Sequence, residues 1–483
     1  MIENHDLDRV IIIHNGMAYF PKASVIKKGF FRKDANAIIK AKQWDDAIVV
    51  SIKNEIKKYG LKGDPSYEAL LDPECYEFEI WHQCYINRNI NVTHLPIHIS
   101  YNKEYMGRLD EELKIFQDAV SRPPFVYDTK LIKAIKSNCR CVQTVFDNLL
   151  HRKKDEAEKL LKELLETYLG EEFIVNTLDN SYSFRGLAPY GYLHSSLNTN
   201  YEEMMNEQLT FFRIRTKNKN VSKEEIRGIK DIVHIPYNLA ARATEMRFSK
   251  AKEPCLYLGV TSFICAKEVR WDENTQELYG SVFVPNAKGL KLKILNLALS
   301  QYLINGMNAY SFDKDDEKNR CIQSGILKLY PLVVAMSFSI SESDRNIKFE
   351  YLISQCLMKA MHEVGIDGIA YLSAQGEDEF QYPHGVNLAL PAYDISDNNQ
   401  YSKYCHMFEI SKPVVLNNQS NENHRSYINK IYKRCYAGTS IENSSSKILV
   451  NDKRVFYGDT KYADYDNYLC SLERHNISMV LSR

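Results

Sequence analysis

The chain has 483 residues, which is longer than one ordinary domain and suggests roughly two to four domains. Apolar residues make up 44% of it and charged residues 26%, as in soluble globular proteins. Lys and Arg together number 62, as do Asp and Glu, so the formal net charge is zero. This balance gives no reason to expect a nucleic acid or an anionic membrane as partner.

The start of the chain, MIENHDLDRV, lacks the basic and apolar regions of a secretory signal. The eleven cysteines are scattered, and the lone C-x-C at Cys139 and Cys141 is a poor zinc signal. We therefore expect a cytoplasmic protein with free thiols and no metal site. The longest apolar run, LYPLVVAMSFSI at 329–340, is too short to span a bilayer, and we expect it to be a buried strand.

Residues 1–204 are predicted to form a helix-rich N-terminal domain. The clearest helix covers 155–169, DEAEKLLKELLETYL, where the leucines and Tyr168 recur at helical spacing and Gly170 follows. At the other end of the chain, residues 396–483 are polar and predict a small C-terminal extension. Within it, KILVNDKRVFYGD predicts a hairpin around Asn451 and Asp452.

Residues 205–395 predict a domain of the α+β class. A helix is expected over 351–364, because its apolar residues follow helical spacing and Gly365 ends the pattern. Mixing short strands with such helices is typical of α+β folds. The strand-like runs are LTFFRIRT, CLYLGV, ELYGSVFVP, YPLVVAMSFSI and GIAYLSA.

Four segments of this middle region carry polar residues in aromatic or apolar surroundings. Taken singly, each has an ordinary structural explanation: a solvent-facing Arg, a core Tyr, a solvated Glu or a turn-forming Ser. Taken together, their order and spacing are informative. The segments are FFRIR at 211–215, HIPY at 234–237 followed by RFS at 247–249, PCLYLG at 254–259 followed by Glu268, and EYLISQ at 350–355 with YLS at 371–373 and GVNLALP at 385–391.

In this order the segments resemble the RES family, which is named for its Arg, Glu and Ser. The resemblance covers about 190 of the 483 residues, and its most specific stretch is HIPYNLAARATEMRFSKAKEPCLYLGVTSFICAKE. The resemblance implies a fold related to ADP-ribosyltransferases for residues 205–395. It also implies an enzyme that consumes NAD, so NAD would be a substrate rather than a cofactor.

The resemblance carries site residues over to this chain: Arg213, Tyr257 and Glu268 match the family's first Arg, strand Tyr and Glu. Arg247 matches the Arg before the Tyr strand. An Arg fork suits a diphosphate, and a Tyr face suits the cationic nicotinamide ring. A carboxylate would stabilise the oxocarbenium-like ribose that forms when the nicotinamide bond breaks.

The family's Ser is less directly matched. Strict alignment puts Leu352 at its place, and the neighbouring Ser354 and the more distant Ser373 are the two candidates for binding NAD. Ser183 to Gly186, SFRG, could imitate the first strand of an ADP-ribosyltransferase, but Arg213 directly precedes the other elements and is preferred over Arg185.

The acceptor stays open, because water, inorganic phosphate and a protein side chain are all compatible with the family. The first two give an NAD glycohydrolase or phosphorylase, and the third gives an ADP-ribosyltransferase. Family members act as toxins or antiviral-defence effectors, so an inhibitory or activating protein partner could bind residues 1–204. The sequence leaves a homo-oligomer open.

Two alternatives from other classes are a HEPN-like ribonuclease and a non-catalytic binding module. RNINVTH, from Arg88 to His94, fits the loose Arg-to-His pattern of HEPN ribonucleases. That pattern belongs on a helix, whereas NVTHLPIHIS contains β-branched residues and Pro96 and predicts a strand.

Overall fold

The structure is a computed structural model of the chain. It describes residues 10–14, 17–21, 32–45, 47–51, 78–80, 92–121, 125–186, 208–220, 228–299, 316–342, 345–375, 382–393, 400–417, 447–450 and 453–477, and the single residues 54, 189, 226 and 304.

The chain divides into two compact units, each built from several segments. Unit 1 comprises Met1–Thr93, Arg108–Arg140 and Gln301–Pro331, and unit 2 comprises His94–Gly107, Cys141–Ser300 and Leu332–Arg483. Neither unit begins or ends at the boundaries expected after residues 204 and 395. The reason is long-range strand pairing, described below, which joins segments that composition separates.

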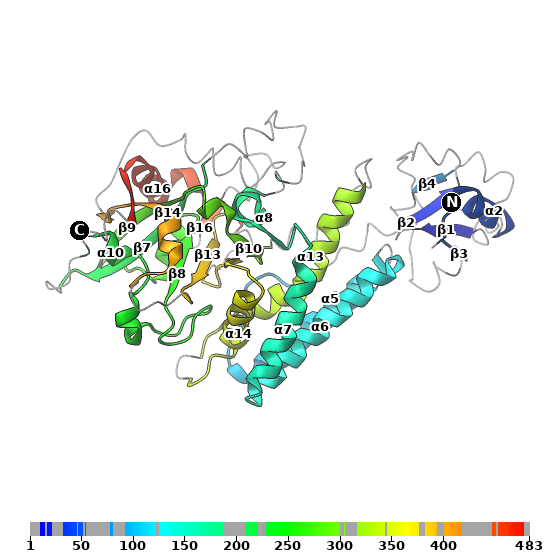
Figure 1. The fold of residues 1–483 in the computed structure, drawn as a ribbon, viewed down its shortest axis with the longest axis horizontal. Helices are drawn as coiled ribbons and strands as arrows, with labels where there is room; N and C mark the ends of the chain where they lie inside the picture. Colours follow the sequence, from blue (N-terminus) through cyan, green and yellow to red (C-terminus); the bar gives the residue numbers. More distant parts are fainter. Residues whose placement is uncertain are drawn as a thin grey trace. The chain divides into compact units, whose positions relative to one another are not determined.

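Unit 1 contains a four-stranded antiparallel sheet in the order β3-β1-β2-β4 (Figure 1). Ile12 lies opposite both Tyr19 and Val49, and it packs with Val10 and Ala35 in a small core. Among the described residues of 1–204, the three longest helices lie after residue 104. The elements are β1 (Val10–His14), β2 (Met17–Pro21), α2 (Arg32–Lys42), β3 (Ile48–Ser51) and β4 (Phe78–Ile80).

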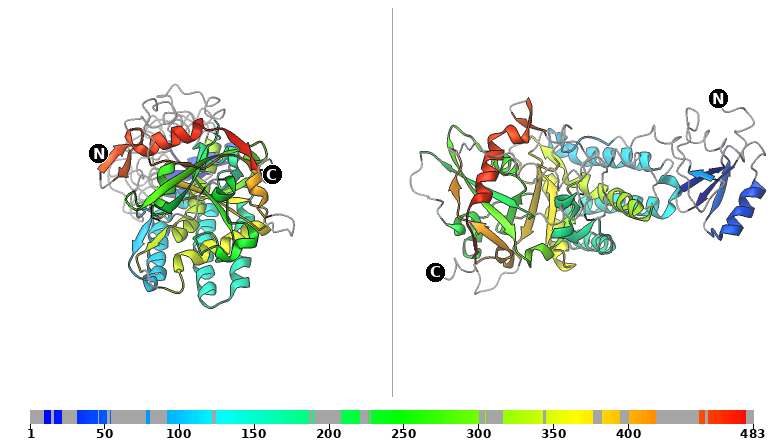
Figure 2. Two further views of the ribbon diagram at one scale, coloured as in Figure 1. Left: turned by 90° about the vertical axis from the view of Figure 1, so that its left-hand side faces the viewer. Right: turned by 90° about the horizontal axis from the view of Figure 1, so that it is seen from above.

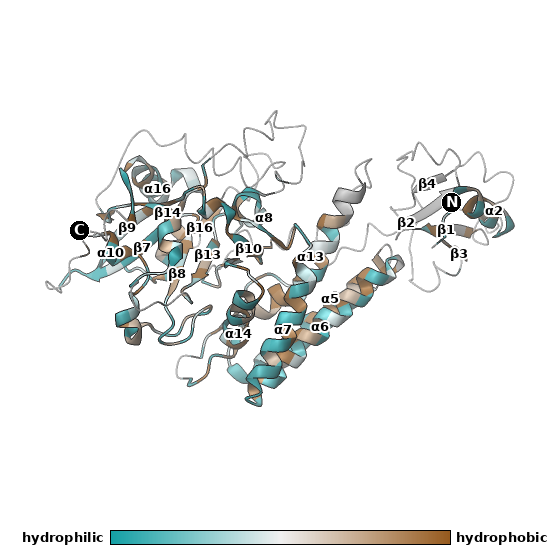
Figure 3. Ribbon diagram, in the orientation of Figure 1, coloured by the Kyte–Doolittle hydropathy of each residue, from teal (hydrophilic) through white to brown (hydrophobic). Residues whose placement is uncertain are grey.

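Long helices account for most of residues 105–168 and two later stretches. The helix expected over 155–169 is confirmed as α7, and its buried residues all come from one face, as the mixed colours along α7 in Figure 3 illustrate. The helix expected over 351–364 is confirmed as α14, and Gly365 follows with a positive φ of 74°. The helices are α5 (Tyr105–Val120), α6 (Thr129–Leu150), α7 (Lys154–Tyr168), α13 (Asp316–Met336) and α14 (Phe349–Glu363).

The apolar run at 329–340 is not one buried strand, as the sequence suggested. Its first eight residues end helix α13, with Pro331 inside the helix, and only Phe338–Ile340 form a strand, β11. Every residue from 329 to 336 is buried. A segment covered on all sides shows no helical periodicity, so its sequence does not separate a strand from a helix.

Unit 2 contains a large sheet that is antiparallel except where β10 pairs with β12. Its order is β18-β14-β9-β7-β8-β13-β12-β10-β6, with β15 also paired to β9. Four of the strand-like runs expected in 205–395 are confirmed as β7, β8, β9 and β12. The strands are β6 (Val175–Thr177), β7 (Phe211–Asn218), β8 (Cys255–Gly259), β9 (Gln276–Pro285), β10 (Lys293–Asn296), β12 (Gly368–Leu372), β13 (Val386–Pro391), β14 (Phe408–Ser411), β15 (Val414–Val415) and β18 (Arg474–Asn476).

This sheet draws strands from all three regions of the sequence. β6 comes from 1–204, and β14, β15 and β18 come from 396–483. Figure 2 shows α16 (Lys461–Ser471) on one side of the sheet and α7 and α14 on the other. Together with the mainly antiparallel pairing, these helices make unit 2 an α+β fold, as the sequence predicts.

Short elements complete the described part of unit 2. The hairpin expected near 451 is confirmed as β16 (Lys447–Val450) paired with β17 (Lys453–Phe456), and its turn residues lie outside the described residues. β5 (Ile97–Ile99) pairs with β11, whereas Arg88 of the ribonuclease pattern is outside the described residues.

The short helices are α8 (Tyr182–Arg185), α10 (Ile229–Ile232) and α11 (Ser262–Glu268). Within the stretches that the structure describes, no helix has the length and apolar character needed to cross a bilayer.

Candidate functional site

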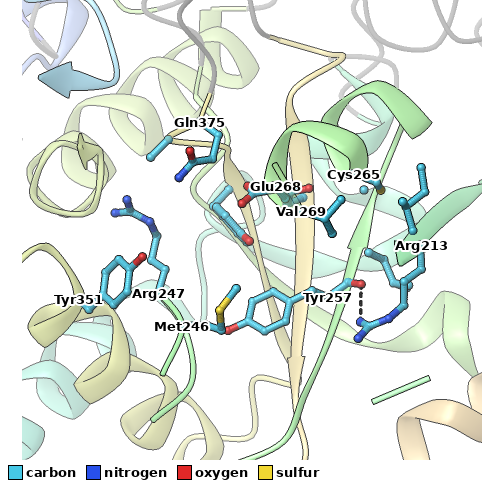
Figure 4. A pocket seen from close by; sticks show the side chains of 15 residues that line it. Arg213, Met246, Arg247, Tyr257, Cys265, Glu268, Val269, Tyr351 and Gln375 are labelled. Atoms are coloured by element: carbon cyan, nitrogen blue, oxygen red, sulfur yellow. Dashed lines mark hydrogen bonds between the residues drawn. The ribbon is translucent and has the colours of Figure 1, made fainter. Parts of the chain in front are cut away.

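A cavity of about 170 Å³ lies in unit 2, beside strands β7, β8 and β13. One buried water needs only about 10–15 Å³, so the cavity has room for part of an organic ligand. Four of the residues expected from the sequence line it: Arg213, Arg247, Tyr257 and Glu268. In the view of Figure 4, Arg247 and Tyr351 lie on one side and Arg213 on the other, with Glu268 and Tyr257 between them.

Arg213 projects from β7, in a strand where Phe212 pairs with Gly259 of β8 and Arg213 pairs with Ser281 of β9. Its Nη1 donates a hydrogen bond of 2.8 Å to the backbone oxygen of Tyr257. Its Nε is buried and has no hydrogen-bond partner among the described residues. Burial, with the nearby charge of Arg215, lowers the pKa of Arg213 to about 10, so the side chain is still a cation at neutral pH.

Tyr257 lines the cavity, and hydrogen bonds to its hydroxyl fix the orientation of its ring. The hydroxyl lies 3.0 Å from Ser249 Oγ and accepts a hydrogen bond of 3.2 Å from the backbone N–H of Phe248. Burial raises the pKa of Tyr257 well above its ordinary value, so the phenol stays neutral. A neutral ring held in this way offers a flat surface for stacking.

Glu268 is the last residue of α11, and its carboxylate is held on one oxygen. Oε1 accepts hydrogen bonds from Ser373 Oγ at 2.7 Å and from Asn387 Nδ2 at 2.8 Å. Burial raises the pKa of Glu268, while the hydrogen bond from Ser373 and the charge of Arg247 oppose the rise. Oε2 has no hydrogen-bond donor among the described residues, so one oxygen is fixed and the other is open to a ligand.

Arg247 is fixed at the opposite side of the cavity. Nη1 and Nη2 donate hydrogen bonds to the backbone oxygens of Met336, at 2.6 Å, and Phe338, at 2.8 Å. The guanidinium lies 5.3 Å from the ring centre of Tyr351. Met336 ends α13, so Arg247 satisfies a carbonyl that the helix leaves without a partner. Because both terminal nitrogens already donate to carbonyls, Arg247 contributes a fixed positive charge rather than a free two-pronged clamp.

The two candidate serines have different surroundings. Ser373 follows β12, and its hydroxyl binds Glu268 directly. Ser354, on α14, is fully buried, and its hydroxyl donates to the backbone oxygen of Arg247 at 2.6 Å. Ser354 therefore supports the loop that carries Arg247, whereas Ser373 is part of the carboxylate cluster. Arg185 lies in helix α8, not on a strand, and forms an ion pair with Asp179 away from the cavity lining.

The sequence analysis gave no role to Asn387, Tyr351 or Gln375, which also line the cavity. For Asn387 a signal was present: a polar amide in the middle of the apolar strand GVNLALP, where it is only 4% exposed. A buried amide in such a strand needs hydrogen-bond partners. In the described part of the chain, no group of three or more His, Cys, Asp and Glu residues is arranged to hold a metal ion.

Comparisons with known proteins give limited similarity. No family model matches the chain. It is 29% identical over 211 residues to the protein named "Putative toxin YopC" of Bacillus subtilis (strain 168), a match that covers 42% of this chain and 46% of that protein. The chain thus spans about half the length of that curated relative.

Among solved structures, the crystal structure of the M. tuberculosis MbcT-MbcA toxin-antitoxin complex has 12% identity, with 43% of this chain and 85% of that chain covered. The TM-score is 0.20, which is too low to assign a fold.

Proposed function

We propose that the cavity binds NAD and that the chain is an NAD-degrading enzyme of the RES type, with an ADP-ribosyltransferase-like catalytic fold. The observation that carries this proposal is the meeting of three groups in one cavity: the cation Arg213, the ring of Tyr257 and the carboxylate of Glu268. In NAD, the diphosphate, the nicotinamide and the ribose are covalently joined, and these groups match Arg213, Tyr257 and Glu268 respectively.

The diphosphate would bind at the arginines. Neither Arg213 nor Arg247 forms an ion pair with a described carboxylate; their recorded acceptors are backbone oxygens. Two arginines and one glutamate line the cavity, so a phosphate group would supply further negative charge to a site with an excess of cations. Nη2 of Arg213 donates to no described residue, whereas Nε is buried, so we assign Nη2 the direct contact with a phosphate oxygen. Arg247 would add long-range attraction.

The nicotinamide would stack on Tyr257. Its ring is cationic, and a neutral phenol face attracts a cation by about 0.5–2 kcal/mol, depending on how far water is excluded. Breakage of the bond to ribose leaves a neutral nicotinamide, so this attraction is lost when the bond breaks and the leaving group is released. A general acid is not required, because nicotinamide departs as a stable neutral molecule.

Glu268 would stabilise the positive charge that develops on the ribose. Ser373 and Asn387 fix Oε1, which leaves Oε2 for the 2-hydroxyl or the anomeric carbon of the sugar. A carboxylate that is already oriented needs no reorganisation in the transition state. Positive charge growing beside it also favours its ionised form, which offsets the effect of burial on its pKa.

The reaction class depends on the acceptor. Water gives ADP-ribose, phosphate gives ADP-ribose phosphate, and a protein side chain gives ADP-ribosylation; no described residue favours one acceptor over another. The similarity to YopC supports a role as a bacterial toxin, or as an effector that depletes NAD in antiviral defence. Such a protein would act in the cytoplasm, with a protein partner on residues 1–204 controlling it.

The proposal is tested by incubating purified protein with NAD, with and without inorganic phosphate. The amounts of nicotinamide, ADP-ribose and ADP-ribose phosphate formed are then measured after chromatographic separation. Glu268→Gln should lower the rate of nicotinamide release by about a hundredfold or more with little change in KM. Glu409→Gln, an exposed glutamate on β14, is the matched control and should behave as wild type. Label retained on protein would favour the transferase. No nicotinamide release by wild type would refute the proposal.

A further inference from the structure

We infer that Asp466, in the C-terminal helix α16, is a positioning residue for Glu268. Its buried carboxylate holds the first turn of α11, the helix that ends at Glu268. This inference rests on the proposed role of Glu268. It gives residues 447–477, which the sequence left without a function, a part in the same site.

Helix α11 needs such support because it has only seven residues, Ser262–Glu268. Isolated helices of this length are not stable in water, and the first N–H groups of any helix lack partners within it. Two acceptors supply partners here. Thr261 Oγ1 accepts from the N–H of Ile264 at 3.2 Å, and Asp466 Oδ1 accepts from the N–H of Ser262 at 2.8 Å.

Asp466 is itself rigidly placed. It is 0% exposed, and its second oxygen, Oδ2, accepts a hydrogen bond from the hydroxyl of Tyr457. A second bond joins the same two helices, since Ser262 Oγ donates to the backbone oxygen of Tyr462 at 3.0 Å. Burial raises the pKa of Asp466 to about 7, while its hydrogen bonds from Ser262 and Tyr457 oppose the rise. The bonds of Ser262 to Asp466 and to Tyr462 together join α11 to α16.

Apolar packing continues this link along α11. Tyr465 and Leu469 of α16 belong to the same buried cluster as Ile264 and Cys265 of α11, together with residues of β7 and β9. Glu268 lies six residues after Ser262, about 9 Å along a helix axis. A short helix moves as one body, so a displacement of its first turn reaches the carboxylate at its end.

Glu268 is consequently held from two directions. Ser373 and Asn387 bind its carboxylate from β12 and β13, while Asp466 fixes the backbone that carries it. Reacting groups must be placed within about 0.5 Å for full effect. Loss of the Asp466 anchor should therefore reduce the chemical step more than the binding of NAD, to which Asp466 does not contribute a cavity surface.

The experiment compares Asp466→Ala, Asp466→Asn and Tyr457→Phe in the full chain. Asp466→Ala should lower kcat for nicotinamide release by about tenfold to a hundredfold, with KM for NAD nearly unchanged. Asp466→Asn should recover most of the loss, because an amide oxygen can still accept from Ser262. Tyr457→Phe disturbs the same buried network but leaves the bond to Ser262, so kcat should stay near wild type.

Hydrogen exchange provides a readout that does not depend on activity. Backbone amides of 262–268 should exchange faster in Asp466→Ala than in wild type, and at the wild-type rate in Tyr457→Phe. If wild type releases no nicotinamide, the proposed function fails, while the exchange rates still decide whether Asp466 anchors α11. Unchanged exchange in Asp466→Ala, or equal loss of kcat in Asp466→Ala and Tyr457→Phe, would overturn the inference.

Ser262→Pro replaces Asp466→Ala if that variant does not fold. It removes the N–H that donates to Asp466 and also the hydroxyl that donates to Tyr462, so Ser262→Ala, which loses only the hydroxyl, is its control. Proline is well tolerated at the first position of a helix. The preceding Thr261 is extended, with φ −140° and ψ 151°, which is the conformation that a residue before proline adopts. The same loss of kcat is expected, and wild-type kcat in a folded Ser262→Pro variant would contradict the anchor.

Discussion

Arg213→Met should make the ligand-free protein more stable while it removes NAD cleavage. Methionine has a similar reach but no charge, and it adapts to irregular apolar space. Wild-type Arg213 keeps a cation in the cavity with a buried Nε that has no partner among the described residues. Residues of a ligand-binding site can destabilise the ligand-free protein, because their hydrogen-bonding partners arrive only with the ligand.

The size of the effect follows from the pKa. Burial lowers the pKa of Arg213 to about 10, from an ordinary value of about 12.5. A difference of one in pKa corresponds to about 1.4 kcal/mol. Keeping Arg213 charged therefore lowers the free energy of unfolding by about 3 kcal/mol. The cost is fully present below pH 10, because the unfolded chain holds this proton more tightly than the folded one. The substitution also removes the hydrogen bond to Tyr257, which lowers the free energy of unfolding by about 1 kcal/mol. The net increase in the free energy of unfolding is therefore near 2 kcal/mol.

Urea denaturation at pH 7, without NAD, measures this gain. Arg185→Met is the control, because Arg185 is buried in the same unit but forms an ion pair with Asp179. The substitution removes the hydrogen bonds of Arg185 to Asp179, which is itself 35% exposed, so this control should lose about 1–3 kcal/mol. The same substitution thus has opposite signs at the two arginines. If Arg213→Met is destabilised as Arg185→Met is, the idea of an unpaired cation awaiting an anion is wrong.

Three further substitutions test the surroundings of the site. Asn387→Ala removes a donor that lowers the pKa of Glu268, so the acidic limb of kcat/KM should move to higher pH; an unmoved limb would contradict the assignment. Gly259→Ala would place its methyl 2.6–2.7 Å from side chains of α11, so thermal unfolding should show a loss of about 1–3 kcal/mol, and a neutral result would contradict the tight packing. Ser354→Ala frees the loop of Arg247, so KM for NAD should rise while kcat changes little; the reverse pattern would mean that Ser354 acts in the chemical step.

Local pattern was sufficient to predict the elements that depend on local sequence. Helices α7 and α14 were predicted within two residues at each end, because half-buried helices show their periodicity. The fully buried end of α13 shows none and was taken for a strand. Four residues of the cavity were predicted from the order and spacing of several segments, and no single residue would have sufficed. The roles of these four residues stay predictions.

Contacts set by distant pairing could not be predicted in this way. Asn387 reaches Glu268 only because β13 pairs with β8, which places residues about 120 positions apart beside each other. Asp466 reaches α11 across a still longer stretch of chain. Strand pairing continues across residues 204 and 395, where composition changes, and such pairing is not visible in local composition.

The interleaving of distant segments has a consequence for a cell that makes this protein. When the ribosome has translated Glu268, the partners that orient its carboxylate, Ser373 and Asn387, have yet to be made, and Asp466 comes later still. Folding of nascent chains proceeds from the N-terminus as synthesis advances. The carboxylate of Glu268 therefore stays unoriented until at least 119 further residues have been made, so an unfinished chain lacks this arrangement of the site.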